Sequence, residues 1–322
     1  MYRYFRNFIA VALIGFITST GLEAQHYTDF EFYDTAPANT RRTMQNNANA
    51  VFRQIHESHF NGRQSINLSR TNATQDAIDN IRSLWNTSQF YCQVPDLMRP
   101  ILRMPNGGWQ VRNIPVFFVA GATPEERNLG IVMEFTAAGL INDIYIALPE
   151  HQYEDFFRGA TGVTDLRRRQ LIVDFVENFR TAYNRKDLPL IEQVFSNDAL
   201  IITGKVVRSH GDSPNPMGVS VEYVTHNKAT YIEGLRRVFQ RNAWLNINFE
   251  EIEVMMHPGN PNVYGVTLKQ HWNASNYSDV GWLFLMIDFR DENNPLIWVR
   301  TWQPPEVPKN DVFGLDNFRI NR

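Results

Sequence analysis

Tryptophans flank a single arginine in the last apolar segment of the chain, at Trp298, Arg300 and Trp302. Residues two apart on a β-strand share one face, so these three side chains are expected to align. A second row with the same spacing precedes them and consists of Trp282, Phe284, Met286 and Asp288. A charged group among aromatic rings suits a ligand that has an apolar body and one polar group. The alternative is that these aromatic residues cover an outer sheet face, where another domain or subunit packs.

Acid–base chemistry has weaker support in the residue pattern. The candidates for proton transfer are Tyr223, His226 and Asp288, and none of them has a partner close in the sequence. No two histidines stand at the spacing of metal ligands, and Cys92 is the only cysteine, which excludes a thiolate metal cluster within one chain. We therefore predict no metal and no cofactor.

The overall charge argues against nucleic acid as a partner. The 322 residues include 31 Lys and Arg and 34 Asp and Glu, a net charge of -3, whereas non-specific binding to nucleic acid requires a basic surface. The length and the 43% content of hydrophobic residues suffice for two domains, each with its own core.

The first 24 residues have the layout of a secretory signal peptide. Arg3 and Arg6 precede an apolar run from Phe8 to Ile17, and small and polar residues follow up to Ala24. The apolar run has about ten residues, roughly half of what a transmembrane helix needs. We expect cleavage near Ala24, a periplasmic or secreted product, and no stable membrane span after cleavage.

An amphipathic helix opens the second half of the chain, and Asp165 can cap its start. Its apolar stripe comprises Ile172, Phe175, Phe179 and Tyr183. Charged residues occupy the opposite side. A short helix, a strand over 199–203 and a further helix capped by Asn227 follow. The remaining strands are predicted over 219–224, before that further helix, and over 247–256, 263–272, 282–289 and 296–302 after it. This order indicates an α+β domain with helices on one face of a curved antiparallel sheet.

The stretch from Leu171 to Gly204 reads LIVDFVENFRTAYNRKDLPLIEQVFSNDALIITG. It resembles the opening of nuclear transport factor 2-like domains, a superfamily that includes SnoaL-like and ketosteroid isomerase-like proteins. The shared features are the long helix, the Asn-x-x-Asp-Leu break, the short helix and the Asp-Ala start of the first strand. The resemblance covers about residues 163 to 305 and implies a cone-shaped α+β domain. Because this fold carries many different activities, the resemblance implies no particular reaction.

Ketosteroid isomerases place a catalytic tyrosine on the long helix and an aspartate base near the end of the first strand. When the chain is aligned on Asn184, Asp187 and Asp198, these positions hold Phe179 and Thr203. Phenylalanine cannot donate a hydrogen bond to an oxyanion, and threonine is no general base at neutral pH. The isomerase reaction is therefore not expected of this chain.

The first half repeats the order of helices followed by strands less clearly. Helices are predicted over 40–59 and 74–85, the second capped by Thr74. Its predicted strands cover 90–94, 109–119, 129–136 and 140–148. The order predicts a divergent copy of the second domain, and an unrelated α+β module is the alternative. The expected division is residues 1–24 as signal peptide, 25–160 and 161–308 as two tandem cone-like domains, and 309–322 as a C-terminal tail, with the joint over 155–164.

We expect an exported, non-catalytic protein whose second domain binds a small apolar or amphipathic ligand or a protein partner. The expected ligand contacts are Phe179, Tyr183, Trp282, Asp288, Trp298, Arg300 and Trp302. One alternative is an enzyme of the dehydratase, isomerase or cyclase type with a non-standard acid–base pair in the cone. Another is a structural scaffold or dimerisation module, in which the two sheets pack on one another or on a second copy of the chain.

Overall fold

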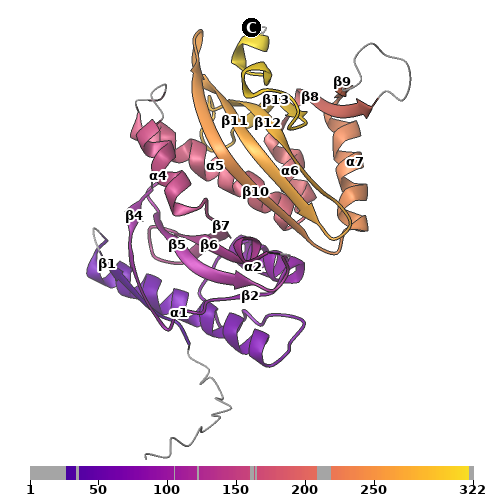
Figure 1. The fold of residues 1–322 in the computed structure, drawn as a ribbon. Helices are drawn as coiled ribbons and strands as arrows, with labels where there is room; N and C mark the ends of the chain where they lie inside the picture. The colour runs from indigo at the N-terminus through magenta and orange to yellow at the C-terminus, as the bar shows by residue number, and fades with distance from the viewer. Residues whose placement is uncertain are drawn as a thin grey trace, which may run out of the picture.

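The computed structural model describes residues 27–33, 36–104, 106–121, 123–159, 163, 165–208 and 219–318. Their arrangement is two α+β domains, one above the other in Figure 1. The predicted signal peptide and its cleavage site lie outside the described residues. Among the helices that are described, none has both the length and the apolar character that a membrane span requires.

The first domain has two long helices packed on an antiparallel sheet, as predicted, and a further strand precedes them. Its helices are α1 (Ala38–Phe60), α2 (Gln75–Thr87), the short α3 (Pro124–Arg127) and α4 (Glu150–Gly159). Its strands are β1 (Asp29–Tyr33), β2 (Phe90–Tyr91), β3 (Asp96–Pro100), β4 (Leu102–Arg103), β5 (Trp109–Phe118), β6 (Asn128–Phe135) and β7 (Ile141–Ile146). The main sheet has the order β2-β5-β6-β7, and β4 pairs with β5. Thr74 caps α2 as predicted, because its side chain accepts a hydrogen bond from the amide of Ala77.

Several features of the first domain were not predicted, among them the strands β1, β3 and β4 and the helices α3 and α4. Strands β1 and β3 form a separate parallel pair, and the outer edge of β1 is hydrogen-bonded by α1, because Asn49 accepts from the amide of Phe30 at 2.8 Å. Helix α4 ends at Gly159 and so occupies the start of the predicted joint. The kinship of this domain with the second stays a prediction.

The second domain confirms the predicted wrapping of an antiparallel sheet around a long helix. Its helices are α5 (Leu166–Asn184), α6 (Leu188–Val194) and α7 (Lys228–Arg241), and two 3-10 turns, η1 (Lys309–Asp311) and η2 (Leu315–Asn317), follow the last strand. Its strands are β8 (Phe195–Arg208), β9 (Val219–His226), β10 (Leu245–His257), β11 (Asn260–Ala274), β12 (Ser278–Asp288) and β13 (Leu296–Gln303). They form one six-stranded sheet in the order β10-β11-β12-β13-β8-β9, in which the β13–β8 pair alone is parallel. Asp165 caps α5 and Asn227 caps α7, as predicted.

The two faces of the second sheet are covered by different parts of the chain. On β12, Leu283, Leu285 and Ile287 face the main core, which also contains the apolar stripe of α5. Phe284 and Met286 face the opposite side, in a smaller cluster with Leu315 and Val299. The chain after β13 therefore covers part of the outer face, and Figure 1 shows it crossing the sheet at the end of the molecule. A homodimer through the sheet faces stays a prediction for the part of that face outside this cluster.

Helix α5 lies between the two domains, and its polar side is buried. Thr181 accepts from the amide of Ile146 at 2.9 Å, and Arg180 donates to the carbonyls of Ile146 and Ala147 at 2.7 and 2.6 Å. Glu177 accepts from the amide of Leu148 at 2.6 Å. Because β7 is the last strand of the first sheet, these side chains satisfy backbone groups that would otherwise remain unpaired. The charged side of the predicted amphipathic helix is thus an interdomain contact surface.

Candidate functional site

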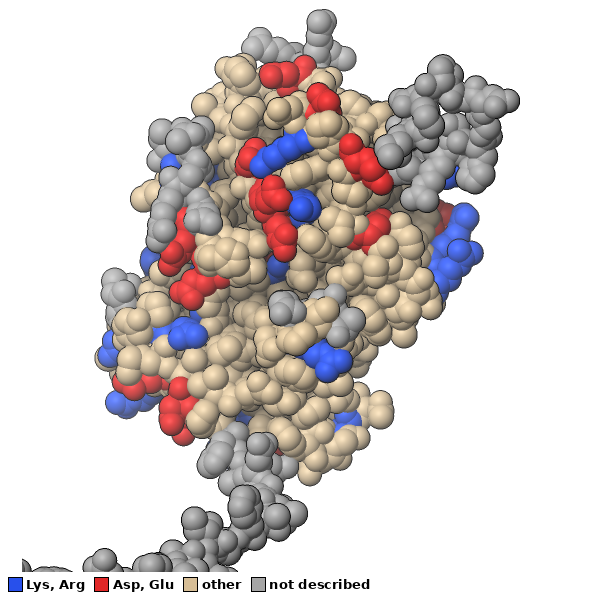
Figure 2. All heavy atoms as spheres, viewed as in Figure 1, with Lys and Arg blue, Asp and Glu red and all other residues tan. Residues whose placement is uncertain are grey.

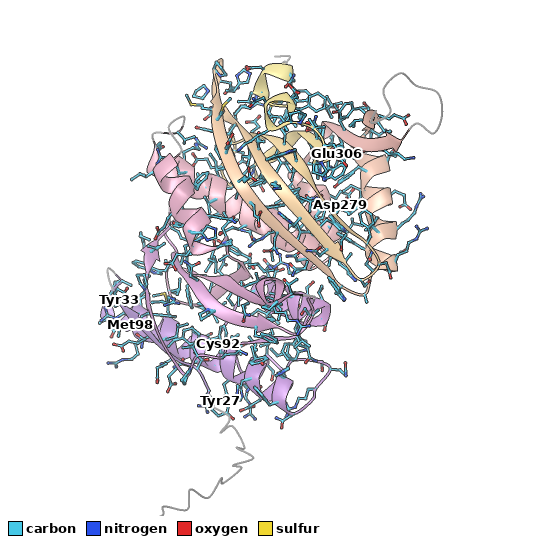
Figure 3. All side chains as sticks on the ribbon, in the orientation of Figure 1. Tyr27, Tyr33, Cys92, Met98, Asp279 and Glu306 are labelled. Atoms are coloured by element: carbon cyan, nitrogen blue, oxygen red, sulfur yellow. The ribbon has the colours of Figure 1, made fainter. Side chains whose placement is uncertain are left out.

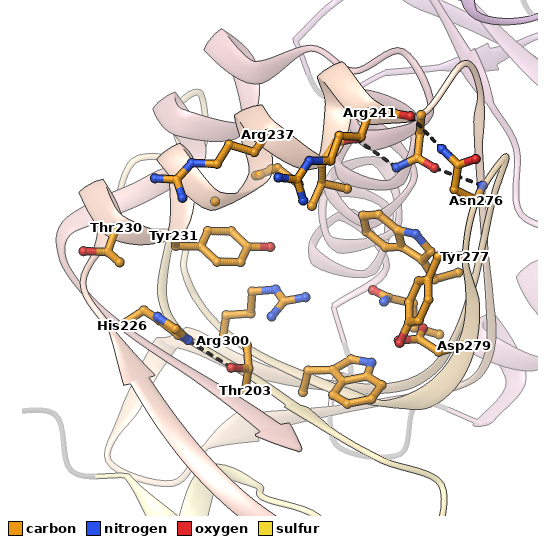
Figure 4. A pocket seen from close by; sticks show the side chains of 17 residues that line it. Thr203, His226, Thr230, Tyr231, Arg237, Arg241, Asn276, Tyr277, Asp279 and Arg300 are labelled. Carbon is orange, nitrogen blue, oxygen red and sulfur yellow. Dashed lines mark hydrogen bonds between the residues drawn. The ribbon is translucent and has the colours of Figure 1, made fainter. Parts of the chain in front are cut away.

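A cavity of about 710 Å³ opens between α7 and the inner face of the second sheet. Figure 4 shows it from close by. The side chains that the argument uses come from five strands and one helix: Thr203 on β8, His226 on β9, Tyr231 on α7, Trp272 on β11, Asp279 on β12, and Arg300 and Trp302 on β13. Tyr277 and Asn276, in the turn between β11 and β12, complete one side of the opening. This volume is within the range of small-molecule sites.

Arg300 places a buried positive charge inside this cavity. Arg300 is only 5% exposed. Its guanidinium carbon lies 5.0 Å from the centre of the Tyr231 ring. In Figure 4 the guanidinium lies in the middle of the cavity. Its Nε and Nη1 have no hydrogen-bond partner among the described residues. Since an unsatisfied buried charged donor is costly, the site is suited to an anionic or carbonyl group of a ligand.

Asp279 and Tyr277 form a hydrogen-bonded pair at another side of the cavity. The Tyr277 hydroxyl donates to Asp279 Oδ2 at 2.7 Å, while Asp279 Oδ1 is buried and has no partner among the described residues. Burial raises the pKa of Asp279, whereas the hydrogen bond from Tyr277 and the charge of Arg300 act in the opposite direction. Burial and the neighbouring carboxylate raise the pKa of Tyr277 to about 12. The pair therefore supplies one free acceptor atom to the cavity.

Two further hydrogen bonds fix the remaining polar groups of the wall. His226 Nε2 lies 3.0 Å from the hydroxyl of Thr203, and this contact is drawn as a dashed line in Figure 4. The hydroxyl of Tyr231 lies 2.6 Å from that of Tyr183, which is in the core behind it. Burial raises the pKa of Tyr183 well above its ordinary value. Both distances are those of hydrogen bonds, so the side chains of His226 and Tyr231 are held in place by other residues of the protein.

The opening of the cavity is basic along α7. Arg237 and Arg241 line it, and Figure 2 shows Lys and Arg side chains gathered at the edge of the molecule where α7 lies. Arg237 is held by Glu233 at 3.3 Å. With Arg300 inside, three arginines and one aspartate line the site, and this balance favours an anionic ligand over a cationic one.

The structure separates the seven expected ligand contacts. Arg300 and Trp302 line the cavity. Phe179 and Tyr183 lie in the core beneath it. The expected alignment of Trp298 with Arg300 is wrong, because Met286 pairs with Val299 and Ile287 with Ile297, which leaves Trp298 as an extra residue in a β-bulge.

The second predicted row faces away from the cavity. Trp282, Phe284, Met286 and Asp288 do share one face of β12, but it is the outer one, where Phe284 stacks on Phe318. Asp288 is bound by Arg290 at 2.6 Å. This row therefore lies on the outer face, as the alternative interpretation had it, but the cover is the chain after β13 and not another domain or subunit.

The three candidates for acid–base chemistry are also separated. His226 lines the cavity, whereas Asp288 lies on the outer face. Tyr223 is 42% exposed, and its hydroxyl accepts a hydrogen bond from Gln303 at 2.9 Å. No pair among these three is brought together. Within the described part of the chain, no group of three or more His, Cys, Asp and Glu side chains is placed to hold a metal ion.

The residues that sequence reasoning missed lie just before a predicted strand. Asp279 and Tyr277 precede residue 282, where the strand was expected to begin, while β12 begins at Ser278. Asp279 pairs directly with Trp272 of β11, so both point into the cavity. The signal that could have located them is the turn around Asn276, because a turn earlier in the sequence implies a longer strand after it. In Figure 3 Asp279 lies in the second domain beside α7, far from the buried Cys92 of the first domain.

Comparisons with known proteins bear on the fold. No protein-family model and no curated protein matches the chain. A structure from Bdellovibrio bacteriovorus is similar to it with 14% identity and a TM-score of 0.33, covering 43% of this chain and 41% of the other, so less than half of that protein is spanned. A naphthalene 1,2-dioxygenase with bound indole is similar with 9% identity and a TM-score of 0.35, covering 49% of this chain and 89% of the other.

A nuclear transport factor 2-like protein of unknown function from Pseudomonas aeruginosa is similar with 11% identity and a TM-score of 0.32, covering 41% of this chain and 97% of the other. The helix and strand order of the second domain is the one predicted from the sequence, with helices on an antiparallel sheet, and this similar structure covers 41% of the chain. At these identities and TM-scores, no argument about activity, ligand or partner rests on them.

Proposed function

We propose that this chain is an exported, non-catalytic binding protein whose second domain holds a small amphipathic ligand. The observation that carries the proposal is Arg300, a buried guanidinium with two unpartnered nitrogen atoms in a cavity of about 710 Å³. A ligand group that accepts hydrogen bonds would satisfy these atoms, and its apolar body would lie against Tyr231, Trp272 and Trp302. The export part of the proposal rests on the pattern of residues 1–24.

The non-catalytic part rests on the residues that replace the isomerase machinery. Phe179 is packed in the core against Tyr183 and Phe195 and donates no hydrogen bond. Thr203 lines the cavity and is hydrogen-bonded to His226. Phe179 therefore cannot stabilise an oxyanion by a hydrogen bond, and Thr203 cannot act as the general base.

One observation favours an enzyme as the second candidate. The enzyme hypothesis requires two titratable groups within hydrogen-bond distance in one cavity, and Tyr277 and Asp279 meet that requirement at 2.7 Å. The raised pKa of Asp279 brings the group closer to the range in which a carboxyl exchanges protons at neutral pH. In that case Asp279→Asn would abolish turnover of a substrate and leave its binding unchanged, whereas a binding protein has no turnover to lose.

The test of the binding function uses 8-anilinonaphthalene-1-sulfonate, a fluorescent aromatic anion. We expect it to bind with one site per chain, and Arg300→Gln to weaken binding by about tenfold to a hundredfold, because a charged hydrogen bond contributes about 1.5 to 3 kcal/mol. The matched control is Arg290→Gln on the outer side of the sheet, which should bind like the unmodified protein.

A second pair of variants tests the cavity itself. Gly234 of α7 lines the cavity and has open space where a side chain would start. Gly234→Trp should fill the cavity and block the probe, while Gly234→Ala should leave binding intact. Equal binding by the tryptophan variant and the unmodified protein would show that the probe binds elsewhere and would refute the proposal.

A further inference from the structure

Two unsatisfied polar groups of opposite character face the cavity from neighbouring strands. Arg300 on β13 offers the donors Nε and Nη1, and Asp279 on β12 offers the acceptor Oδ1. Neither group is used by the other, because none of these three atoms has a hydrogen-bond partner among the described residues. A ligand that satisfies both must carry an acceptor at one end and a donor at the other.

The space between the two groups is lined by rings. Tyr231 lies over the guanidinium of Arg300, with 5.0 Å between its ring centre and the guanidinium carbon, and Trp272 stands directly opposite Asp279 in the β11–β12 register. Figure 4 shows Arg300 in the middle of the cavity and Asp279 together with Tyr277 at its side. A flat, rigid body between the two polar ends matches such walls, since aromatic rings stack on one another.

We propose that the ligand is an aromatic or alicyclic hydroxy acid, with its carboxylate on Arg300 and its hydroxyl donating to Asp279. This inference rests on the binding function proposed above and names the ligand class. A carboxylate fits because the guanidinium is permanently charged and binds carboxylates in a fixed geometry. A hydroxyl fits the other end better than an ammonium group, because the three arginines that line the cavity disfavour a positive charge on the ligand.

The experiment compares three probes that share one rigid body: 4′-hydroxybiphenyl-4-carboxylate, biphenyl-4-carboxylate and 4-phenylphenol. Isothermal titration of the chain after residue 24 gives the dissociation constant of each. We expect the hydroxy acid to bind roughly tenfold to a hundredfold more tightly than either compound with one polar group, because a hydrogen bond to a charged group contributes about 1.5 to 3 kcal/mol.

Two variants assign the ends of the ligand. Asp279→Leu removes the acceptor and should make the dissociation constants of the hydroxy acid and the plain acid equal. Asp279→Asn keeps an amide oxygen as acceptor, so it should retain part of the preference for the hydroxy acid. Arg300→Gln should weaken both acids and leave 4-phenylphenol unchanged. If the leucine variant does not fold, as judged by circular dichroism, the three probes on the unmodified protein and on the asparagine variant still decide the question.

The outcomes separate this inference from the binding function. Tight, Arg300-dependent binding of both acids without a preference for the hydroxyl would overturn the hydroxy acid and leave the binding function standing. Binding of the anilinonaphthalene probe without binding of any biphenyl compound would overturn it as well. If no probe binds, or if Gly234→Trp binds all of them normally, the binding function fails too.

Discussion

We expect replacement of Glu134 to give the clearest change in how the free energy of unfolding depends on pH. Glu134 lies on β6 in the interdomain contact, 9% exposed, and its Oε1 accepts from the Tyr145 hydroxyl at 2.7 Å and from Gln110 at 3.3 Å. Asp174 of α5 is in the same network, since Gln110 donates to it at 3.1 Å. Burial, followed by the charge of Asp174, raises the pKa of Glu134 from 4.5 to about 8. The two domains are therefore joined through a carboxyl that keeps its proton at neutral pH.

The sign of the pH dependence follows from proton binding. In the unfolded chain Glu134 loses its proton near pH 4.5, whereas in the folded protein it keeps it up to about pH 8. Between these values the folded state binds one more proton, so the free energy of unfolding falls as the pH rises through this window and levels off above it. The pKa difference is about 3.5, and each unit corresponds to about 1.4 kcal/mol, which gives at most about 5 kcal/mol.

Glu134→Gln should abolish the fall in unfolding free energy between about pH 4.5 and pH 8. The amide is neutral at every pH, and its oxygen can accept the same two hydrogen bonds. We expect the variant to match the unmodified protein near pH 4.5 and to be more stable by roughly 2 to 5 kcal/mol at pH 9. Urea unfolding followed by tryptophan fluorescence at both pH values measures the difference. Glu31→Gln, at an exposed position on β1, is the matched control and should change neither value.

Two results would contradict the account of Glu134. One is a glutamine variant that is no more stable than the unmodified protein at pH 9. The other is a stabilisation of equal size at pH 4.5 and pH 9, because a gain that does not depend on pH cannot come from the removal of a titrating group.

Three further changes test the second domain. Gly234→Ala should raise the free energy of unfolding by about 0.5 to 1 kcal/mol, because glycine weakens a helix interior and the new methyl group meets open space; a lower urea midpoint would contradict this. Asn227→Ala removes the cap on the amide of Thr230 and should cost about 1 kcal/mol in thermal unfolding, while Asn227→Asp should retain stability; equal losses in both variants would exclude the cap as the cause. Leu315→Ala opens the outer cluster beside Phe284 and should cost roughly 2 to 4 kcal/mol in urea unfolding and speed proteolytic removal of the chain end; unchanged proteolysis would mean that the segment is held elsewhere.

The helices α1, α2, α5, α6 and α7 were predictable because their signals are local, whereas α3 and α4 were not predicted. The caps at Thr74, Asp165 and Asn227 are single side chains bonded to amides two or three residues away, and the stripe of α5 repeats with the turn of the helix. The strand pair β1–β3 was missed because its partners are more than sixty residues apart, and nothing near Asp29 indicates where it pairs.

The candidate site was predictable only in part. Alternation along β13 correctly grouped Arg300 with Trp302, but one extra residue at Trp298 shifts the side of the sheet on which it lies. A bulge depends on the pairing with β12 and β8 and leaves no pattern of its own in the sequence. Asp279 was missed for a related reason, since the strand begins four residues before the expected position.

The sequence by itself determined that the second half folds as helices on an antiparallel sheet, because the periods of the helix and the strand are properties of the backbone and appear directly in the order of residues. The tertiary structure decided which faces are covered. The charged side of α5 looks solvated in isolation, yet Glu177 and Arg180 satisfy the backbone of β7 from another domain. Such pairing depends on residues about thirty positions away. In the same way, only the folded chain brings Arg300 and Asp279 to one cavity.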